Sequence, residues 1–466
     1  MRSMKLALFA LVVAGGCKPG DFGAALDKAP VRYIGVPEGF GFAAGLTLVP
    51  LAPPDDKPKV AARLLFAGPD VQSLGLADFD GDGKPQIQIA ASDELTDLGL
   101  PVGQGGITSG AWMNGPSTAG TILLGMPNVA TVAGQPVPAG RVAYLNPSAD
   151  AGGKEAFAAA RIPQDGPSTF GAPGTQPRGH FGIAVAHGLV TQAVSDEAVV
   201  VSDNGVHVLG AGMVSTTCTG AIATPTDLYR SLAVENFLSD GNQEIAVGAP
   251  VEGGTGQVYI LQYGPNPANP SVASELFCAR TFGVPDPAGN PAVGEFGTSL
   301  AAVSHPGGVA DLVVSAPPDR VYLFYGDGLR SPKTFTNGNP ASDFGRRVAL
   351  VDIDGDGIKE LAVSATQADV GSTKRAGQVL VYKLDGDGTT PIAMINEGNP
   401  INSTEFFGIG LAELEFNSSR ACAPKGTDAH VLVAGASAGI FTYFRFAGTA
   451  DPTTAIAPDP RCFAQP

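Results

Sequence analysis

The segment Arg347-Val-Ala-Leu-Val-Asp-Ile-Asp-Gly-Asp-Gly-Ile-Lys-Glu-Leu-Ala-Val-Ser-Ala365 decides the fold of this chain. Both of its ends are short and apolar, which is typical of buried β-strands. Between them, Asp352, Asp354 and Asp356 stand at alternate positions, and Glu360 adds a carboxylate at the ninth. Hard oxygen ligands this closely spaced are what Ca²⁺ prefers in proteins. The segment therefore predicts a strand–loop–strand unit that carries a calcium ion.

A near copy of this loop occurs at Asp78-Phe-Asp-Gly-Asp-Gly-Lys-Pro-Gln86, where Gln86 replaces the last acid. We expect it to sit on the same strand–loop–strand frame and to bind Ca²⁺ more weakly, because one negative charge is missing. Neither loop is an EF-hand, since position 12 of the stronger loop is Val363 rather than a bidentate glutamate. The predicted ligands are the side chains of Asp352, Asp354, Asp356 and Glu360 with the carbonyl of Ile358, and those of Asp78, Asp80, Asp82 and Gln86 with the carbonyl of Lys84.

A third loop retains only part of the pattern. Asn236, Asp240 and Glu244 fall on ligand positions, but Leu238 occupies the middle one. A leucine side chain offers no oxygen, so the sequence favours an ordinary loop here.

A Phe-Gly dipeptide recurs along the chain, each time before a small-apolar strand, a variable loop and a second apolar strand. The second strands are continuously apolar, which predicts that both of their faces are buried. No helical periodicity lies between the strands, so other sheets must cover those faces. Sheets stacked around an axis form a β-propeller, whereas a set of β-sandwiches is the alternative. The dipeptides begin at Phe181, Phe296, Phe344 and Phe407, and the second strands are 197–202, 244–250, 311–317, 360–365 and 430–436.

The combination of Phe-Gly, the aspartate loop, a Gly-Ala-Pro strand end and a Val-Tyr strand resembles the FG-GAP repeat family, which includes the propeller of integrin alpha subunits. Residues 344–384 show most of these pieces in order, and the resemblance extends over roughly 35–450. It implies a seven-bladed propeller with Ca²⁺ loops in some blades and partner binding through surface loops. We expect each Phe to fill the wedge between neighbouring blades and its Gly to relieve the turn.

The expected fold is thus all-β, a single propeller domain over 35–466 with seven blades; six or eight are the alternatives. Units begin near 181, 228, 296, 344 and 407, and the stretch before 180 has room for two or three more. Residues 18–34 are expected to form a tether, and a Pro-rich insertion is expected around 93–139.

The first residues are typical of an export signal. Arg2 and Lys5 precede a short apolar run, and Gly15-Gly16 precede Cys17. This pattern resembles a bacterial lipobox, although Ala14 stands where leucine is common. We therefore expect an exported lipoprotein of the bacterial outer membrane or cell surface, with lipid on Cys17. A periplasmic or secreted protein with a fortuitous cysteine is the alternative.

Four cysteines remain when Cys17 is set aside. An even number in an exported protein suggests two disulfides, for which three pairings exist. Proximity in sequence favours Cys218–Cys278 and Cys422–Cys462.

Charge and motifs narrow the function classes. The net charge of −16 disfavours nucleic acid as a partner, because phosphates would be repelled. No linear motif assembles a nucleophile, an acid and a base, so no catalytic residue is predicted. We expect a calcium-stabilised, non-enzymatic module that binds a protein or glycan at the cell surface and meets the membrane only through a lipid anchor. The alternatives are a hydrolase or lyase whose site is drawn from several blades, and a purely architectural envelope protein.

Overall fold

The computed structural model describes about three fifths of the chain, mainly the strands and their shorter connections. The described residues are 31–34, 46–53, 57, 59–68, 74–80, 85–90, 106–113, 120–127, 140–149, 155–165, 180–191, 193, 195–203, 205–210, 213–216, 218, 230–250, 254–285, 295–306, 308–353, 357–386, 388–396, 406–416, 429–436 and 439–444.

The described strands form seven four-stranded antiparallel sheets, so the prediction of seven blades is confirmed. Blades I to III contain β2 (Thr47–Leu51), β3 (Val60–Ala67), β4 (Leu74–Asp80) and β5 (Pro85–Ala90); β6 (Ser109–Met113), β7 (Thr121–Met126), β8 (Arg141–Ala149) and β9 (Glu155–Asp165); and β10 (Val185–Gly188), β11 (Glu197–Ser202), β12 (Gly205–Leu209) and β13 (Met213–Thr216).

Blades IV to VII follow in the same order, and blade VII takes its fourth strand from the N-terminal part of the chain. They contain β14 (Ser231–Glu235), β15 (Glu244–Ala249), β16 (Gln257–Gly264) and β17 (Glu275–Phe282); β18 (Leu300–Val303), β19 (Asp311–Ala316), β20 (Arg320–Phe324) and β21 (Lys333–Thr336); β22 (Phe344–Val351), β23 (Glu360–Ala365), β24 (Gln378–Tyr382) and β25 (Ala393–Ile395); and β26 (Gly410–Phe416), β27 (Ala429–Ala436), β28 (Gly439–Phe444) and β1 (Val31–Ile34).

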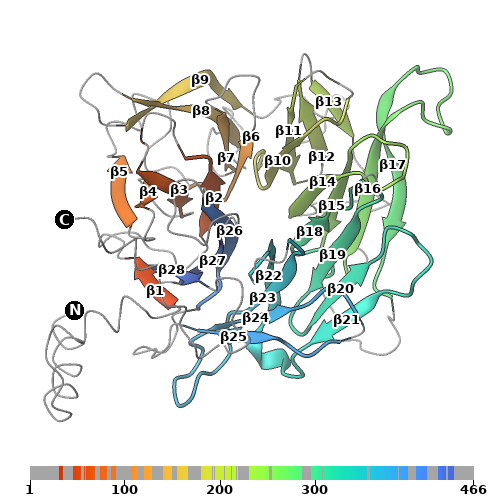
Figure 1. Cartoon of the computed structure of the whole chain (residues 1–466). Helices are drawn as coiled ribbons and strands as arrows, with labels where there is room; N and C mark the ends of the chain where they lie inside the picture. The colour runs from red at the N-terminus through yellow and green to blue at the C-terminus, as the bar shows by residue number, and fades with distance from the viewer. Residues whose placement is uncertain are drawn as a thin grey trace, which may run out of the picture.

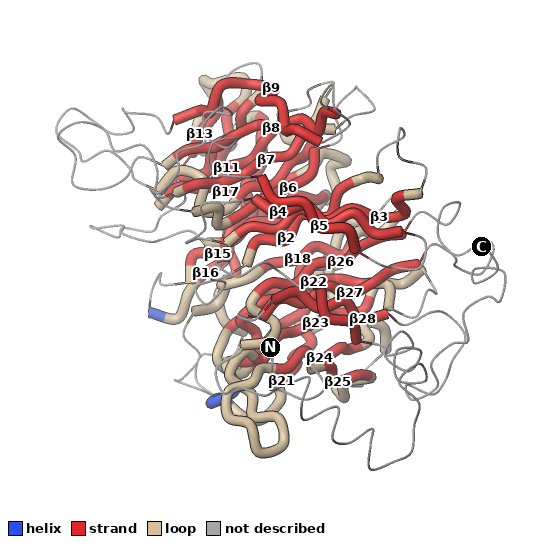
Figure 2. Tube along the Cα trace, turned by 90° about the vertical axis from the view of Figure 1, so that its left-hand side faces the viewer, coloured by secondary structure: helices blue, strands red, loops and turns tan. Residues whose placement is uncertain are grey.

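The first strand of each blade lies nearest a common axis, and the blades surround that axis (Figure 1). Each of these inner strands contacts the inner strand of the next blade, and β26 contacts β2, so the ring is closed. Strands make up most of the described chain, as the view turned by 90° shows (Figure 2). Within the described ranges there is no α-helix, and no helix there has the length and hydrophobicity of a membrane span.

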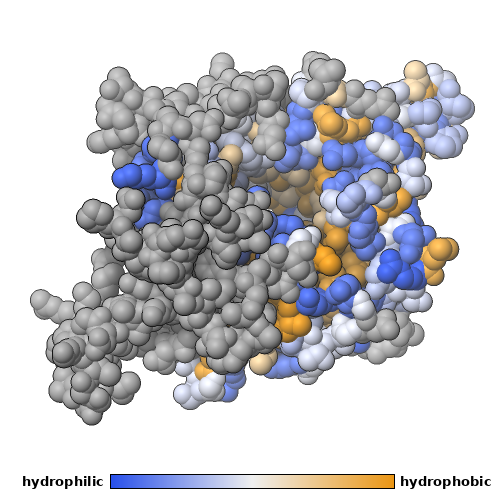
Figure 3. Space-filling view, viewed as in Figure 1, coloured by the Kyte–Doolittle hydropathy of each residue, from blue (hydrophilic) through white to orange (hydrophobic). Residues whose placement is uncertain are grey.

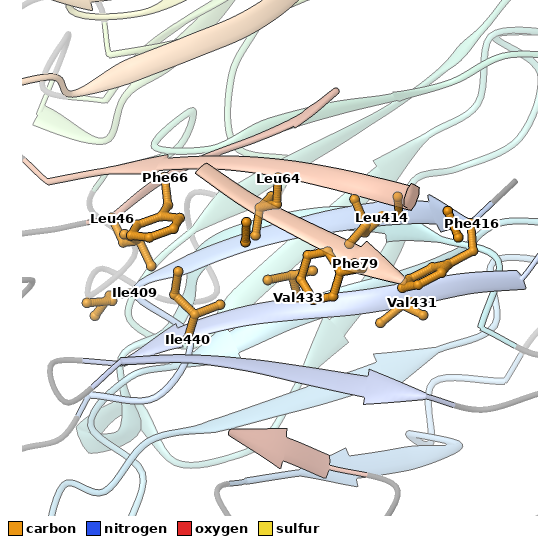
Figure 4. Packing of buried hydrophobic residues seen from close by; sticks show 13 residues of the cluster. Leu46, Leu64, Phe66, Phe79, Ile409, Leu414, Phe416, Val431, Val433 and Ile440 are labelled. Atoms are coloured by element: carbon orange, nitrogen blue, oxygen red, sulfur yellow. The ribbon is translucent and has the colours of Figure 1, made fainter. Parts of the chain in front are cut away.

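Closure of the ring uses both ends of the chain. β1 pairs with β28, with Val31 opposite Tyr443, and becomes the fourth strand of blade VII. Blades I and VII also share an apolar cluster, in which Phe66 lies near Leu46 and Phe79 packs against Phe416 (Figure 4).

Two segment boundaries predicted from the sequence, those of the tether and of the insertion, differ in the structure. Residues 31–34 were expected in the tether but belong to a blade, because they supply a strand edge that β28 would otherwise leave unpaired. The expected insertion around 93–139 contains β6 and β7, which are blade strands. The signal segment 1–17 with Cys17, and residues 18–30, lie outside the described residues.

Each Phe-Gly dipeptide seals a junction between blades, as predicted. Phe181, Phe296, Phe344 and Phe407 have no exposed surface, and each bridges in parallel to the residue that precedes the third strand of the previous blade. Phe344, for example, packs with Val313 and Val321 of blade V as well as with residues of its own blade. The following glycines have φ between 93° and 99°, a conformation that glycine adopts without a steric penalty.

The second strands are buried along their whole length. All six residues of β11, β15, β19 and β23 are buried, which agrees with their continuously apolar sequences. Blades III and IV are also joined covalently, because Cys218 and Cys278 form a disulfide with a Cα–Cα distance of 5.8 Å. Cys422 and Cys462 lie outside the described residues.

Candidate metal centre

The aspartate loop of blade VI connects the first and second strands of its sheet. β22 ends at Val351 and β23 begins at Glu360, and these two residues stand opposite each other in the ladder. The nine-residue segment 352–360 therefore leaves and re-enters the sheet at one place. This brings the first and last predicted ligands, Asp352 and Glu360, to the base of the same loop.

Both of these carboxylates are buried, with 5% of Asp352 and 1% of Glu360 exposed. Asp352 Oδ2 accepts a hydrogen bond of 2.9 Å from the N–H of Gly357, and Glu360 Oε2 accepts one of 3.0 Å from the N–H of Ile353. Each end of the loop thus holds the other end's backbone. Burial of a carboxylate is costly unless hydrogen-bond donors or positive charge lie nearby. Here the N–H groups of Gly357 and Ile353 are the donors, and their hydrogen bonds close the loop.

This donor set fits a hard cation. Carboxylate oxygens at both ends of a closed loop are the ligand type that Ca²⁺ selects. Ile358 is 51% exposed, so its side chain lies outside the core, and its predicted role requires only its carbonyl. Asp354 and Asp356 lie outside the described residues. No group of three or more acidic, histidine or cysteine side chains gathers among the residues that are described.

A residue of the next blade, Glu413, holds this loop from outside. Glu413 Oε1 accepts a hydrogen bond of 3.0 Å from the N–H of Asp352, and its Oε2 forms an ion pair with Nζ of Lys359. His430 Nδ1 lies 2.9 Å from Glu413 Oε1. The two ends of the blade VI loop are therefore clamped to blade VII.

Burial alone would raise the pKa of Glu413, but hydrogen bonds from His430, Lys359 and the N–H of Asp352 outweigh it and lower that pKa. The bond to Glu413 in turn raises the pKa of His430. Sequence reasoning missed Glu413 because it lies more than 50 residues from the loop that it contacts, and no local pattern marks it.

The aspartate loop of blade I has a different setting, which corrects the sequence prediction. It connects the third and fourth strands of its sheet rather than the first and second, and Asp78 and Gln86 stand opposite each other inside the β4–β5 ladder. Gln86 is exposed. In blade I both residues lie inside the ladder, whereas in blade VI Asp352 lies just outside it and only Glu360 is paired.

Asp78 is also engaged by cations of the protein. Arg63 stands opposite it on β3, with Nε 2.6 Å from Asp78 Oδ1 and Nη2 3.0 Å from Oδ2. Lys57 Nζ lies 3.4 Å from Oδ2. Arg63 is 1% exposed, so Asp78 is half of a buried ion pair, and its role as a calcium ligand stays a prediction. Asp80 ends β4, and Asp82 and Lys84 lie outside the described residues.

The third, incomplete loop is closed by its own acid. Glu244 Oε2 accepts hydrogen bonds of 2.7 and 3.0 Å from the N–H groups of Phe237 and Leu238, while the buried Oε1 has no hydrogen-bond partner. Burial raises the pKa of Glu244 to about 7, and the charge of Asp240 adds to that rise. Glu244 therefore holds this loop through two backbone hydrogen bonds, and the expectation that the loop binds no ion stays a prediction.

An acid at the first position of the second strand recurs in blades III to VI, at Glu197, Glu244, Asp311 and Glu360. In each blade it accepts a hydrogen bond from a backbone N–H of a neighbouring loop; for Glu197 and Asp311 the donors are Thr191 and Gly326, both at 2.7 Å. The carboxylate at the ninth position of the aspartate pattern therefore stabilises a neighbouring loop through a backbone hydrogen bond in all four blades.

A serine–histidine contact also appears, which sequence reasoning did not identify. Ser202 Oγ lies 3.0 Å from His207 Nε2 in the β11–β12 hairpin. Both side chains are only 1% exposed and pack beside Phe181, so a substrate cannot reach the serine in this conformation. A nucleophile must be accessible to its substrate, and this pair therefore supports packing rather than catalysis.

Comparison with known families agrees with this geometry. The family description "FG-GAP repeat" matches residues 344–382. That range starts at the wedge residue Phe344, includes the blade VI loop with its two buried carboxylates, and ends with β24.

Proposed function

We propose that this seven-bladed β-propeller of FG-GAP repeats is a calcium-stabilised, non-enzymatic binding module displayed outside the cell. In this proposal one Ca²⁺ occupies the blade VI loop, and the lipobox-like Cys17 anchors the chain to a membrane. The partner is a protein or a glycan of the cell surface.

The observation that carries the calcium part is the pair of buried carboxylates at the base of the blade VI loop. Asp352 and Glu360 are fixed by backbone N–H groups of the loop that they enclose. A site whose ligands are already in place loses little conformational entropy when the ion binds. Asp354, Asp356 and the carbonyl of Ile358 would complete an all-oxygen shell of the kind that extracellular calcium modules use.

Calcium at this site would act on the fold rather than on a reaction. The loop joins β22 to β23, and Glu413 joins the same loop to blade VII. An ion that holds the loop closed would therefore stiffen both the inner part of blade VI and its junction with the next blade. Rigid blades present their surface loops in a fixed arrangement, which lowers the cost of ordering them when a partner binds.

Thermal unfolding with Ca²⁺, Mg²⁺ or EDTA tests the calcium part. Extracellular calcium modules bind at roughly 10⁻⁴–10⁻³ M, so about 10 mM Ca²⁺ is expected to stabilise the fold by about 1.4–2.7 kcal/mol. Equal concentrations of Mg²⁺ should do less, because that ion requires near-ideal octahedral geometry and gives up its water reluctantly. If EDTA leaves the melting temperature unchanged, the calcium part is wrong.

Affinity capture from an envelope extract, with and without Ca²⁺, tests the binding part. We expect defined partners to be retained in Ca²⁺ and reduced in EDTA. A protein that responds to calcium but retains no protein or glycan would favour the architectural alternative. Fractionation of cells that express the wild type or Cys17→Ser tests the anchor, which predicts loss of membrane association in the variant.

A further inference from the structure

A small recess opens between blades IV and V on the side where their first-to-second-strand loops lie. Aromatic side chains from both blades line it: Phe237 and Phe282 from blade IV, and Phe324 and Tyr325 from blade V. The volume open to a water-sized sphere is about 20 Å³, which holds about one water molecule. A partner's side chain would therefore lie across the mouth of the recess rather than inside it. Over the right half of the molecule, orange hydrophobic residues are interspersed with blue polar ones (Figure 3).

The walls of the recess are held by the acids that begin the second strands. Glu244 accepts the N–H of Phe237 at 2.7 Å, and Asp311 accepts the N–H of Gly326, next to Tyr325, at the same distance. The rings of Phe282 and Phe324 lie against each other with centroids 5.0 Å apart. In blade IV, the loop that has lost its central aspartate thus positions an aromatic residue instead of an ion.

The side chain of Arg280 lines the edge of this recess. Its side chain is exposed, and its guanidinium carbon lies 4.5 Å from the centroid of the Phe282 ring. Within the described part of the chain it makes no hydrogen bond and no ion pair. Stacking on a ring fixes a guanidinium while its N–H groups remain available in its plane, which is the geometry that carboxylates bind.

A second arginine nearby provides an internal contrast. Arg330 also stacks on an aromatic ring, with its guanidinium carbon 3.5 Å from the centroid of Tyr325, but its Nε lies 2.9 Å from Asp327 Oδ2. The charge of Arg330 is therefore met by Asp327, whereas no described residue forms an ion pair with the side chain of Arg280. Leu329, next to Arg330 in the loop between β20 and β21, is 89% exposed.

We propose that this recess binds a peptide segment of a partner protein in which a bulky apolar side chain adjoins a carboxylate. The apolar side chain lies over the mouth of the recess, against the partly exposed rings of Phe282 and Phe324, and the carboxylate pairs with Arg280. This inference rests on the proposed binding function and specifies where and what the propeller binds. Aromatic residues and arginine are the residue types that most often dominate binding energy at protein interfaces.

A peptide fits this recess better than a sugar does. Its walls are mainly aromatic and aliphatic, and the N–H of Gly326 is already bonded to Asp311. The hydroxyl groups of a sugar would enter without partners, and each unpaired buried polar group is costly. Charge complementarity also favours a local acid, because the stacked Arg280 side chain has no acidic partner among the described residues.

Isothermal titration calorimetry with short capped peptides tests the proposal. The probe contains an aspartate–phenylalanine pair flanked by glycines, and its controls replace the aspartate by asparagine or the phenylalanine by alanine. We expect saturable binding of the probe and at least about tenfold weaker binding of either control, because charged hydrogen bonds and buried rings each contribute that much. Arg280→Met in the protein should cause a similar loss, and Arg280→Lys a smaller one.

Arg346→Met is the matched control variant. Arg346 is an exposed arginine that pairs with Glu295 near the Phe-Gly junctions rather than at the recess, so its loss should leave peptide affinity within about twofold. The peptide proposal is overturned if the probe shows no saturable binding to the wild type, if Arg280→Met binds it equally well, or if an oligogalacturonate binds in its place. Partners retained equally by wild type and Arg280→Met in affinity capture would overturn this site while leaving the proposed binding function intact.

Discussion

The aspartate loops of blades I and VI have nearly the same sequence and opposite surroundings. In blade VI, Asp352 and Glu360 sit at the base of a loop between the first and second strands, and they accept backbone N–H groups of that loop. In blade I, Asp78 sits inside a ladder between the third and fourth strands and is paired with the buried Arg63. A motif thus specifies candidate ligands, but their neighbours in the sheet decide whether those ligands are available.

The largest effect is expected from Arg63→Ala in blade I. It would leave the carboxylate of Asp78, which is 5% exposed, without its main counter-charge. Breaking a buried ion pair on one side typically costs about 3–5 kcal/mol, so we expect a loss of that order in urea unfolding. The loss should be the same in Ca²⁺ and in EDTA. If Ca²⁺ rescues Arg63→Ala, then blade I holds the ion that we assign to blade VI.

The next largest expected effect is a difference in calcium response between variants of Asp352 and Asp78, the first aspartates of the two loops. Asp352→Asn keeps an oxygen for the N–H of Gly357 but removes a charge, so it should abolish most of the calcium stabilisation of about 1.4–2.7 kcal/mol. Asp78→Asn should lower stability in Ca²⁺ and in EDTA alike, and so preserve the calcium response. Melting temperatures across a Ca²⁺ titration measure both. Equal calcium responses in the two variants would contradict the comparison.

Blade IV offers a smaller, pH-dependent effect. Folding raises the pKa of Glu244 from its ordinary 4.5 to about 7, so the native state favours the protonated form. This contribution to stability is fully present below about pH 4.5 and is lost as the pH rises through about 7. Glu244→Gln should therefore be more stable than the wild type by about 1–2 kcal/mol at pH 8 and equal to it near pH 4. Denaturant unfolding at both pH values is the measurement; a constant difference would show that the titration of Glu244 is not its cause.

The smallest effect is expected from Gln86→Glu, which restores the ninth acid of the blade I pattern. Gln86 is exposed and lies in a ladder, so the change should alter stability by no more than about 0.5 kcal/mol. It should not create a second calcium response in the same titration. A new response would show that the last carboxylate, rather than the position of the loop between strands, limits binding in blade I.

Much of the fold could be predicted because its signals are local and repeated. The continuously apolar second strands required burial on both faces, and the Phe-Gly dipeptides marked the junctions at which Phe181, Phe296, Phe344 and Phe407 are now seen to pack. The strand that closes the ring could not be predicted in this way. β1 has only four residues, and its partner β28 lies about 400 positions away.

The candidate site was predictable only in part for the same reason. Asp352 and Glu360 could be identified because they belong to one short segment with an unusual spacing of carboxylates. Glu413, which clamps that segment, and Arg63, which pairs with Asp78, are single charged residues in ordinary strands. Nothing in their local sequence distinguishes them from solvated surface charges.

By itself, the sequence determined the repeat, the seven-bladed all-β architecture and the carboxylate spacing on which the proposed Ca²⁺ site rests, because periodicity and residue spacing are properties of short segments. Tertiary structure alone decided which aspartate faces a loop and which faces an arginine, and it placed Arg280 beside rings from two blades. Coulomb and desolvation energies depend on distances between groups far apart in the chain, and only the folded ring sets those distances.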